Sequence, residues 1–370
     1  MAIAFYFLLT TLPIYLHEVL KADKSITGLV LSSYTIASLI MRPFTGTAVD
    51  TIGRKGILLT AYLIFSLLFG VYVFAATVLF MTVLRIAHGL AWGATSTASA
   101  TFVVDIIPAS RRGEGIGYYG LSMVAAMAIG PAIALWLIVD GEFNRMFLIA
   151  FMLCVLSYIM LLFVRFPPFV PHPKNSGFEW KNLFEVRSLV PSSNAILTQL
   201  TYGGLLSFVA LYGKEIGIKS PGLFFVVFAG GLFISRSFSG RIFDKDGPRR
   251  VMITGFLLLI TAFILLSLDK NYTGYLISAF LFGIGNGITM PSFQAMVNNM
   301  VEPHRRGAAN SSYFTAFDLG ISSGMAIIGT ISEFTSMTTA FLISSAICFA
   351  GMIYFLMFVV KYYERNRLKV

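Results

Sequence analysis

The sequence predicts an all-α membrane protein with twelve transmembrane helices in two pseudo-symmetric six-helix bundles. Three observations lead to this prediction. The 370-residue chain is 57% hydrophobic and only 12% charged, with a mean hydropathy of +0.81, whereas soluble proteins carry about 25% charged residues. Twelve apolar stretches are each long enough for a span, which needs about 20 residues. The second half of the chain also repeats the first.

The twelve apolar stretches are expected to be helices. Strands of a membrane barrel would be about 10 residues long and strictly alternating, and helices satisfy their own backbone hydrogen bonds in lipid. The first stretch has no charged start and no cleavage site, so we expect a retained helix and not a signal peptide. Cys154 and Cys348 lie in such stretches and are expected to be small buried hydrophobic residues. The stretches are centred near residues 10, 36, 65, 89, 126, 154, 200, 231, 259, 287, 320 and 350.

The net charge of +10 follows the predicted topology. Threading twelve spans places 20 of the 27 Lys and Arg residues on one side, six on the other side, and Arg85 inside a span. Lysine and arginine mark the cytoplasmic side, so we expect both termini in the cytoplasm. The excess charge therefore indicates contact with a lipid bilayer and no nucleic-acid partner.

The chain repeats itself at an offset of 194 residues. IMRPFTGTAVDTIGRKGILLT (40–60) aligns with ISRSFSGRIFDKDGPRRVMIT (234–254), and the Arg-Arg-Gly run at 111–113 recurs at 305–307. The segment 166–188 is rich in proline and polar residues, which break helices. We therefore expect an N-terminal bundle (1–165), a cytoplasmic linker (166–188) and a C-terminal bundle (189–370). Parallel repeats of this kind are one design of secondary transporters.

The loop between the second and third stretches carries a specific motif. The pattern G-x-x-x-D-x-x-G-R-K, residues 46–55, resembles the signature loop of the major facilitator superfamily, and residues 240–250 resemble it with Pro248 as a departure. The resemblance implies the major facilitator fold and a cytoplasmic latch in which Asp50 meets the start of the eleventh helix and Arg54 bridges to Asp105. A short positive connector is the alternative reading. The expected latch residues are Gly46, Asp50, Gly53, Arg54, Lys55, Asp105, Gly240, Asp244, Gly247 and Arg249.

Two charged residues inside spans are candidates for proton coupling. A charge at the centre of a span costs roughly 2.5 to 3.5 kcal/mol on insertion scales and is usually functional. LRIAHGLAWGATS (84–96) resembles the fourth-helix motif of proton-linked members, with Arg85 at the motif's arginine. Asp318 lies about ten residues, or about 15 Å, into its span. The alternatives are a structural arginine for Arg85 and a packing role for Asp318.

Another stretch resembles the fifth-helix motif of antiporters. In residues 117–135 this motif is matched by Gly117, Gly130 and Pro131, while Ala126 and Ala134 replace glycines. Such a helix is thought to seal the path against ion leak, and an ordinary kinked helix is the alternative. In the family, substrate contacts come from spans 1, 4, 7 and 10. The expected substrate-binding residues are Tyr6, His88, Trp92, Gln199, Tyr202, Asn286, Met290 and Gln294.

The resemblance points to the twelve-span drug:proton antiporter and sugar efflux subgroup. We expect a proton-coupled exporter of small amphipathic molecules, a monomer in the bacterial inner membrane, whose partners are its substrate, protons and lipid. No G-x-x-x-x-G-K-[ST] motif occurs, so we expect no cofactor and a proton gradient as the energy source. No catalytic or metal spacing is visible among the four histidines, which argues against an enzyme. A sugar or metabolite facilitator or symporter, including one for a metallophore, remains the alternative.

Overall fold

The computed structural model describes residues 1–22, 24–138, 141–168 and 183–368. Within these ranges the chain is helical and contains no strand. The long helices are α1 (Ala2–Glu18), α2 (Lys24–Thr51), α3 (Arg54–Val71), α4 (Val78–Ile106), α5 (Arg112–Leu137), α6 (Phe143–Leu162), α7 (Val186–Glu215), α8 (Leu223–Asp246), α9 (Pro248–Leu268), α10 (Tyr272–Asn299), α11 (Arg306–Phe334) and α12 (Met337–Tyr354). The π-helix η5 (Phe355–Val359) and α13 (Val360–Asn366) continue α12, and the short helices η1 (Tyr72–Phe74), η2 (Ala109–Arg111) and η4 (Pro303–Arg305) lie at helix ends.

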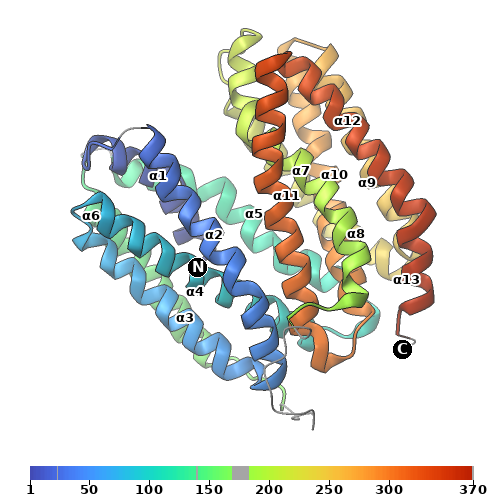
Figure 1. The fold of residues 1–370 in the computed structure, drawn as a ribbon, viewed down its shortest axis with the longest axis horizontal. Helices are drawn as coiled ribbons and strands as arrows, with labels where there is room; N and C mark the ends of the chain where they lie inside the picture. The colour runs from blue at the N-terminus through green and yellow to red at the C-terminus, as the bar shows by residue number, and fades with distance from the viewer. Residues whose placement is uncertain (23, 139–140, 169–182, 369–370) are drawn as a thin grey trace. The chain divides into compact units, whose positions relative to one another are not determined.

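Each of the twelve centres expected from the sequence lies in a separate helix from α1 to α12 (Figure 1), which confirms the all-α fold. In the described part of the chain, nine helices are long and apolar enough to cross a membrane: α3, α4 and α6 to α12. The helix α1 is apolar but has only 17 residues, and α2 and α5 are not among the nine. Length and composition therefore support most of the twelve spans individually.

The helices form two compact units that are not contiguous in sequence. Unit 1 consists of Met1–Ile106, Ala125–Phe184 and His304–Ser311. Unit 2 consists of Ile107–Val124, Glu185–Pro303 and Ser312–Val370. The helix α5 thus starts in unit 2 and ends in unit 1, and α11 does the reverse. Of the linker expected at 166–188, residues 169–182 lie outside the described residues.

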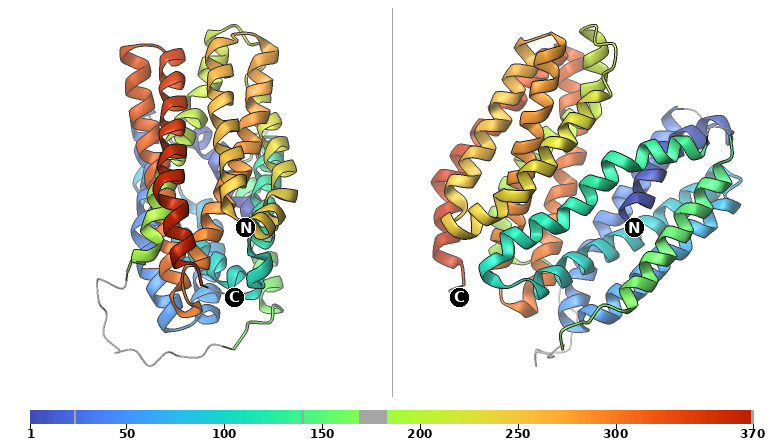
Figure 2. Two further views of the ribbon diagram at one scale, coloured as in Figure 1. Left: turned by 90° about the vertical axis from the view of Figure 1, so that its right-hand side faces the viewer. Right: turned by 180° about the vertical axis from the view of Figure 1, so that it is seen from behind.

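The same packing pairs occur in both units. In unit 1, α2 packs on α4, and α3 packs on α4 and α6; in unit 2, α8 packs on α10, and α9 packs on α10 and α12. The pair formed by α1 and α6 likewise corresponds to the pair formed by α7 and α12. The helices of unit 2 run alongside one another in both views of Figure 2. This packing agrees with the internal repeat of the sequence.

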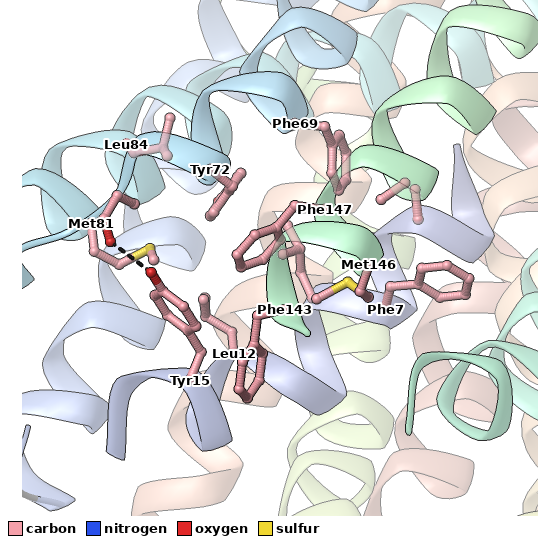
Figure 3. Close-up of a cluster of buried hydrophobic side chains, with 14 of the residues drawn as sticks. Phe7, Leu12, Tyr15, Phe69, Tyr72, Met81, Leu84, Phe143, Met146 and Phe147 are labelled. Atoms are coloured by element: carbon pink, nitrogen blue, oxygen red, sulfur yellow. Dashed lines mark hydrogen bonds between the residues drawn. The ribbon is translucent and has the colours of Figure 1, made fainter. Parts of the chain in front are cut away.

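The core of unit 1 is rich in aromatic side chains (Figure 3). Tyr15, Phe143 and Phe147 meet edge to face, with ring centroids 5.1 and 5.4 Å from Tyr15. The Tyr15 hydroxyl donates a hydrogen bond to the Ala75 carbonyl at 3.0 Å. Tyrosines that are buried usually find such a partner, and here a backbone carbonyl satisfies the hydroxyl of Tyr15. The expected burial of Cys154, in the same core, and of Cys348 is observed.

The turns before α3 and α9 need glycine. Gly53 has φ of 110° and Gly247 has φ of 77°, a region that side chains with a Cβ rarely adopt. Each glycine lies directly before its helix, and Pro248 occupies the first turn of α9, where its missing N–H costs no helical hydrogen bond. The two signature stretches therefore end in the same sharp reversal, and the Pro248 departure fits the helix start.

Candidate functional site

The carboxylate of Asp50, near the end of α2, caps the first turn of α11. Its two oxygens accept hydrogen bonds from the backbone N–H groups of Gly307 and Ala308, both at 2.8 Å. The N-terminus of a helix carries a partial positive charge and unpaired N–H groups, so it favours a carboxylate. All three residues belong to unit 1. We call Asp50, Arg54, Asp105, Arg306 and Gly307 the Asp50 cluster.

This contact depends on the close approach of two glycines. A Cβ built on Gly46 would lie 2.6 Å from the Gly307 carbonyl oxygen and 2.6 Å from Cβ of Ser311. A Cβ built on Gly307 would meet the Gly46 carbonyl and lie 2.9 Å from the Asp50 carboxyl carbon. Both positions therefore exclude any larger residue while the helices keep this distance.

Two arginines complete the Asp50 cluster around Asp105, at the end of α4. Arg54 donates from Nε to Asp105 Oδ2 at 2.7 Å, and its Nη2 lies 3.6 Å from Asp50 Oδ1. Arg306 donates from Nη1 to Asp105 Oδ1 at 2.7 Å. The four charged side chains are only 6–12% exposed. Two acids and two bases therefore form a balanced buried network, in which ion pairs interact more strongly than in water.

The second copy of the motif repeats the helix cap. Asp244, near the end of α8, accepts hydrogen bonds from the N–H groups of Gly113 at 2.8 Å and Glu114 at 3.0 Å. Gly240 approaches Gly113 as Gly46 approaches Gly307, so that a Cβ on Gly240 would meet the Gly113 carbonyl. All these residues belong to unit 2. We call Asp244, Glu114, Arg112, Asn299 and Arg241 the Asp244 cluster.

The Asp244 cluster has different charges around its cap. Arg112 donates to the neutral amide oxygen of Asn299 at 2.6 Å, where the first copy has Arg306 and Asp105. Glu114 accepts from Arg241 Nε at 2.6 Å and from Arg111 Nε at 2.8 Å. The arginine side chains of these two pairs are 61% and 67% exposed. This cluster therefore places its ion pairs at the surface, where they are worth little.

The end of the chain is attached to the Asp244 cluster through Asn299. The side-chain N–H₂ of Asn299 donates to the Tyr363 hydroxyl at 3.2 Å, and its backbone carbonyl accepts from the N–H of Leu368 at 2.9 Å. Tyr363 lies in α13, which follows the π-helix η5. Asn299 therefore joins α10, the start of α5 through Arg112, and the C-terminal helix.

Two of the expected latch residues make none of these contacts, and three residues that do make them were not expected from the sequence. Lys55 is exposed, with its ammonium 6.0 Å from the Phe166 ring centre, and Arg249 is exposed with no hydrogen bond or ion pair to any described residue. Sequence reasoning did not assign Arg306, Arg112 or Glu114 a role. The repeated Arg-Arg-Gly run was the signal for Arg306 and Arg112, whose partners lie 201 and 187 residues away, and it did not include Glu114.

A second set of polar residues is buried in unit 1 around Arg85. The guanidinium carbon of Arg85 lies 4.0 Å from the centre of the Tyr34 ring. Three residues further along α4, His88 Nδ1 shares a hydrogen bond with the Tyr72 hydroxyl at 3.0 Å. In the described part of the chain, Arg85 Nε and His88 Nε2 have no hydrogen-bond partner, and no acid is ion-paired with Arg85. The charge of Arg85 is therefore compensated by the Tyr34 ring and by the neutral hydroxyl of Tyr72, with no acid paired to it in the described part of the chain.

The remaining expected residues of unit 1 lie on α1, α4 and α5. Trp92 stacks on Phe5 with ring centroids 4.8 Å apart and an interplanar angle of 11°. Tyr6 packs against Gly130, where a Cβ would lie 2.8 Å from Cβ of Tyr6. Pro131 follows within α5, and its side chain lies outside the described residues. Gly130 thus allows α5 to approach α1 closely.

The other expected residues belong to unit 2. Gln199 and Asn286 are buried, and their side-chain carbonyl oxygens have no partner among the described residues. Tyr202 stacks on Phe228 at 5.9 Å. Two further positions lie on α10: Met290 Sδ is 3.9 Å from Arg236 Nη2, and the backbone carbonyl of Gln294 accepts a hydrogen bond from Asn298 Nδ2. Gly117, in α5, faces the backbone carbonyl of Arg236. Asp318 is half-buried in α11. Arg85 and Asp318 thus belong to different units.

Among the described residues, no group of three or more His, Cys, Asp or Glu side chains could hold a metal.

Comparison with known families and proteins gives a consistent result. A model described as Major Facilitator Superfamily matches residues 1–245 and again 194–369. The staphylopine export protein of Staphylococcus aureus is 22% identical over 92% of this chain and 89% of its own length. A multi-drug resistance efflux pump PmrA homolog of Lactococcus lactis is 23% identical over 98% and 93%. The quinolone resistance protein NorA of Staphylococcus aureus is 24% identical over 87% and 84%.

Solved structures share the fold. The human organic anion transporter MFSD10 (TETRAN) superposes with a TM-score of 0.84 and 14% identity, covering 95% of both chains. The transporter FucP in the outward conformation gives a TM-score of 0.75 and 13% identity, covering 100% of this chain and 98% of its own. At these identities the likeness concerns the fold alone.

Proposed function

Because the chain belongs to the Major Facilitator Superfamily, we propose that it is a proton-coupled exporter of small amphipathic organic molecules that works by alternating access. Family membership makes it a multi-pass integral membrane protein and a transporter, not an enzyme. The proposal adds the direction, the driving ion and the substrate class. It also places a monomer in the bacterial inner membrane, with both termini in the cytoplasm.

The direction of transport is supported by the relatives. Those named above cover most of this chain, and their names describe staphylopine export, multidrug efflux and quinolone resistance. This observation carries the proposal. The partial fifth-helix motif at Gly117, Gly130 and Pro131 points the same way. The close contact between Gly130 and Tyr6 fits a helix that closes the transport path against ions.

We propose that the Asp50 and Asp244 clusters act as the cytoplasmic latch. Each binds a carboxylate of one half of the sequence to a helix start of the other half, at Gly307 and at Gly113. Releasing these contacts would allow the two halves to move with respect to each other. Removing one member of a buried ion-pair network leaves an uncompensated charge, so the Asp50 cluster would hold the closed state only while all of its members are in place.

Energy from a proton gradient is sufficient for this task. One proton moving through 100 mV releases about 2.3 kcal/mol. At about 1.4 kcal/mol per tenfold change, this sustains roughly a 40-fold substrate gradient. We propose that Asp318 and Arg85 both take part in proton coupling, with Asp318 as the residue that carries the proton. The aromatic and amide side chains at Trp92, Tyr202 and Asn286 would contact the substrate.

Inside-out vesicles test this proposal directly. Vesicles from cells expressing the protein are loaded with an acidic interior, and the accumulation of norfloxacin, a fluorescent quinolone that carries a carboxylate, is followed by fluorescence. We expect accumulation that stops when a protonophore removes the pH gradient and that is lost in Asp50→Asn. Accumulation unaffected by the protonophore would refute proton coupling. Uptake into whole cells driven by inward protons would instead favour a sugar or metabolite symporter.

A further inference from the structure

We propose that the substrate carries a carboxylate, and that Arg85 and His88 bind it. The inference rests on the proposed transport function and specifies its substrate class. It starts from one feature of unit 1: a buried cation whose surroundings contain aromatic rings and a neutral hydrogen-bonding chain but no acid.

The guanidinium of Arg85 is only 4% exposed. A buried charge is normally paired with an opposite charge, yet the described residues supply none to Arg85. The face of the Tyr34 ring, 4.0 Å away, compensates part of the charge. Since Nε still lacks an acceptor, the guanidinium retains the donor that a bidentate contact with a carboxylate requires.

His88 provides a second donor one helical turn away. Residues three apart on a helix lie on the same face, and His88 is 1% exposed. When the Tyr72 hydroxyl donates to Nδ1, the ring proton resides on Nε2, which has no partner in the described part of the chain. Arg85 and His88 then offer N–H groups from adjacent turns of α4, a combination that matches an anion with two oxygens.

The internal repeat shows that this polar group is not needed for the fold. At the offset of 194 residues, Arg85 corresponds to Ala279, His88 to Phe282, Tyr34 to Phe228 and Tyr72 to Leu266. The helices α8 and α10 pack together in unit 2 as α2 and α4 do in unit 1, with these four apolar residues in place. A packing role alone would therefore be served by apolar side chains.

The surroundings of Arg85 and His88 indicate the rest of the substrate. Phe65 and Phe69 lie 4.5 and 4.6 Å from the His88 ring, and Trp92 lies 5.6 Å from Phe65 and stacks on Phe5. Aromatic faces suit an apolar body next to the charged group. An amphipathic organic acid combines both properties, whereas an inorganic anion would use only the charge.

Calorimetric titration of the purified full-length protein tests the proposal with three probes. Phenylbutyrate, phenylbutanol and phenylbutylamine share the ring and the chain and differ in the terminal group. We expect phenylbutyrate to bind at least about tenfold more tightly than the alcohol, and the amine to bind most weakly. Equal affinity for the acid and the alcohol in the wild-type protein overturns the proposal without any variant.

Single substitutions show which side chains cause the preference for the acid over the alcohol. Arg85→Gln is expected to remove the preference for the acid and to leave the affinity for the alcohol within about twofold; His88→Gln should reduce the preference by a smaller factor. Arg145→Gln is the matched control, since Arg145 also faces a ring, that of Trp136 at 5.7 Å, but is exposed. A preference that persists in Arg85→Gln, or that disappears equally in Arg145→Gln, contradicts the assignment.

The calorimetric titration and the vesicle transport experiment can give opposite results, because they test the anion site and the transport function separately. Proton-dependent efflux of norfloxacin together with equal binding of acid and alcohol would remove the anion site and keep the transport function. A clear preference for the acid in a protein that does not export would keep the site and remove the proposed direction of transport.

Discussion

The Asp50 cluster and the Asp244 cluster have the same cap and different surroundings. In both, a carboxylate accepts from two consecutive backbone N–H groups at a helix start, and a pair of glycines lets the backbones meet. Around Asp50 two arginines and a second acid are buried together. Around Asp244 the neutral Asn299 takes the position of that second acid, and the arginines of the ion pairs are largely exposed. Both copies keep the geometry of the helix cap, but the charges around the two caps differ in number and in burial.

The difference has an energetic consequence. Removing one member of a buried ion pair leaves an uncompensated charge and costs about 3–5 kcal/mol, whereas an exposed pair contributes about 0–1 kcal/mol. The Asp50 cluster therefore contributes most of the free energy that holds the latch closed. The Asp244 cluster mainly fixes the position of the helices that it joins.

Asp50→Asn is the strongest test of this comparison. It leaves Arg54 and Arg306 with one acid between them, so we expect a loss of about 3 kcal/mol in stability and at least a tenfold lower norfloxacin efflux. Asp244→Asn should lose only about 1 kcal/mol, as expected for one hydrogen bond. Thermal unfolding midpoints in detergent and vesicle transport measure both, with the exposed Asp246→Asn as control. Equal losses in the two variants would show that the surrounding charges do not matter.

The paired glycines test the shared part of the geometry. Gly46→Ala and Gly240→Ala each place a methyl group against a facing carbonyl, so we expect similar losses of about 1–3 kcal/mol from overpacking. Gly56→Ala and Gly230→Ala, which have open space around the added Cβ, are the controls. A large effect in only one member of the Gly46 and Gly240 pair would contradict equivalent caps.

Asn299→Asp is expected to make the second cluster resemble the first. The new carboxylate would accept from Arg112 and from the Tyr363 hydroxyl, where the amide makes its contacts now. We expect a gain of about 1 kcal/mol, since hydrogen bonds to charged groups are stronger than neutral ones. A higher unfolding midpoint with slower efflux is the predicted result. An unchanged midpoint would mean that burial of the new charge cancels the gain.

Arg241→Gln should have the smallest effect. Its pair with Glu114 is exposed on the arginine side and Glu114 keeps Arg111, so we expect the unfolding midpoint and the efflux to stay near those of the wild-type protein. Arg306→Gln, in the buried cluster, serves as its counterpart and should lose several times more. If the loss in Arg241→Gln equalled that in Arg306→Gln, the exposed pairs would contribute as much to the latch as the buried ones.

Much of the fold could be predicted from the sequence because hydrophobic length and the repeat are local signals. The helix positions and the ion pair between Arg54 and Asp105 follow from them and from the family resemblance. The roles of Arg306 and Glu114 could not be predicted, since their partners Asp105 and Arg241 lie 201 and 127 residues away and meet them only where α11 and α5 begin. The different behaviour of Lys55 and Arg249 has the same cause: a basic residue in a motif contributes only if its helix face is turned toward an acid.

The division of the two units has a consequence for biosynthesis. Unit 1 includes His304–Ser311, so a ribosome that has produced the first six helices has not yet made the donors that cap Asp50. The nascent first half must wait in the bilayer with an uncapped carboxylate until residues 307 and 308 emerge. Halves produced as two separate polypeptides in one cell should consequently find each other, whereas either half alone should be removed by quality-control proteases.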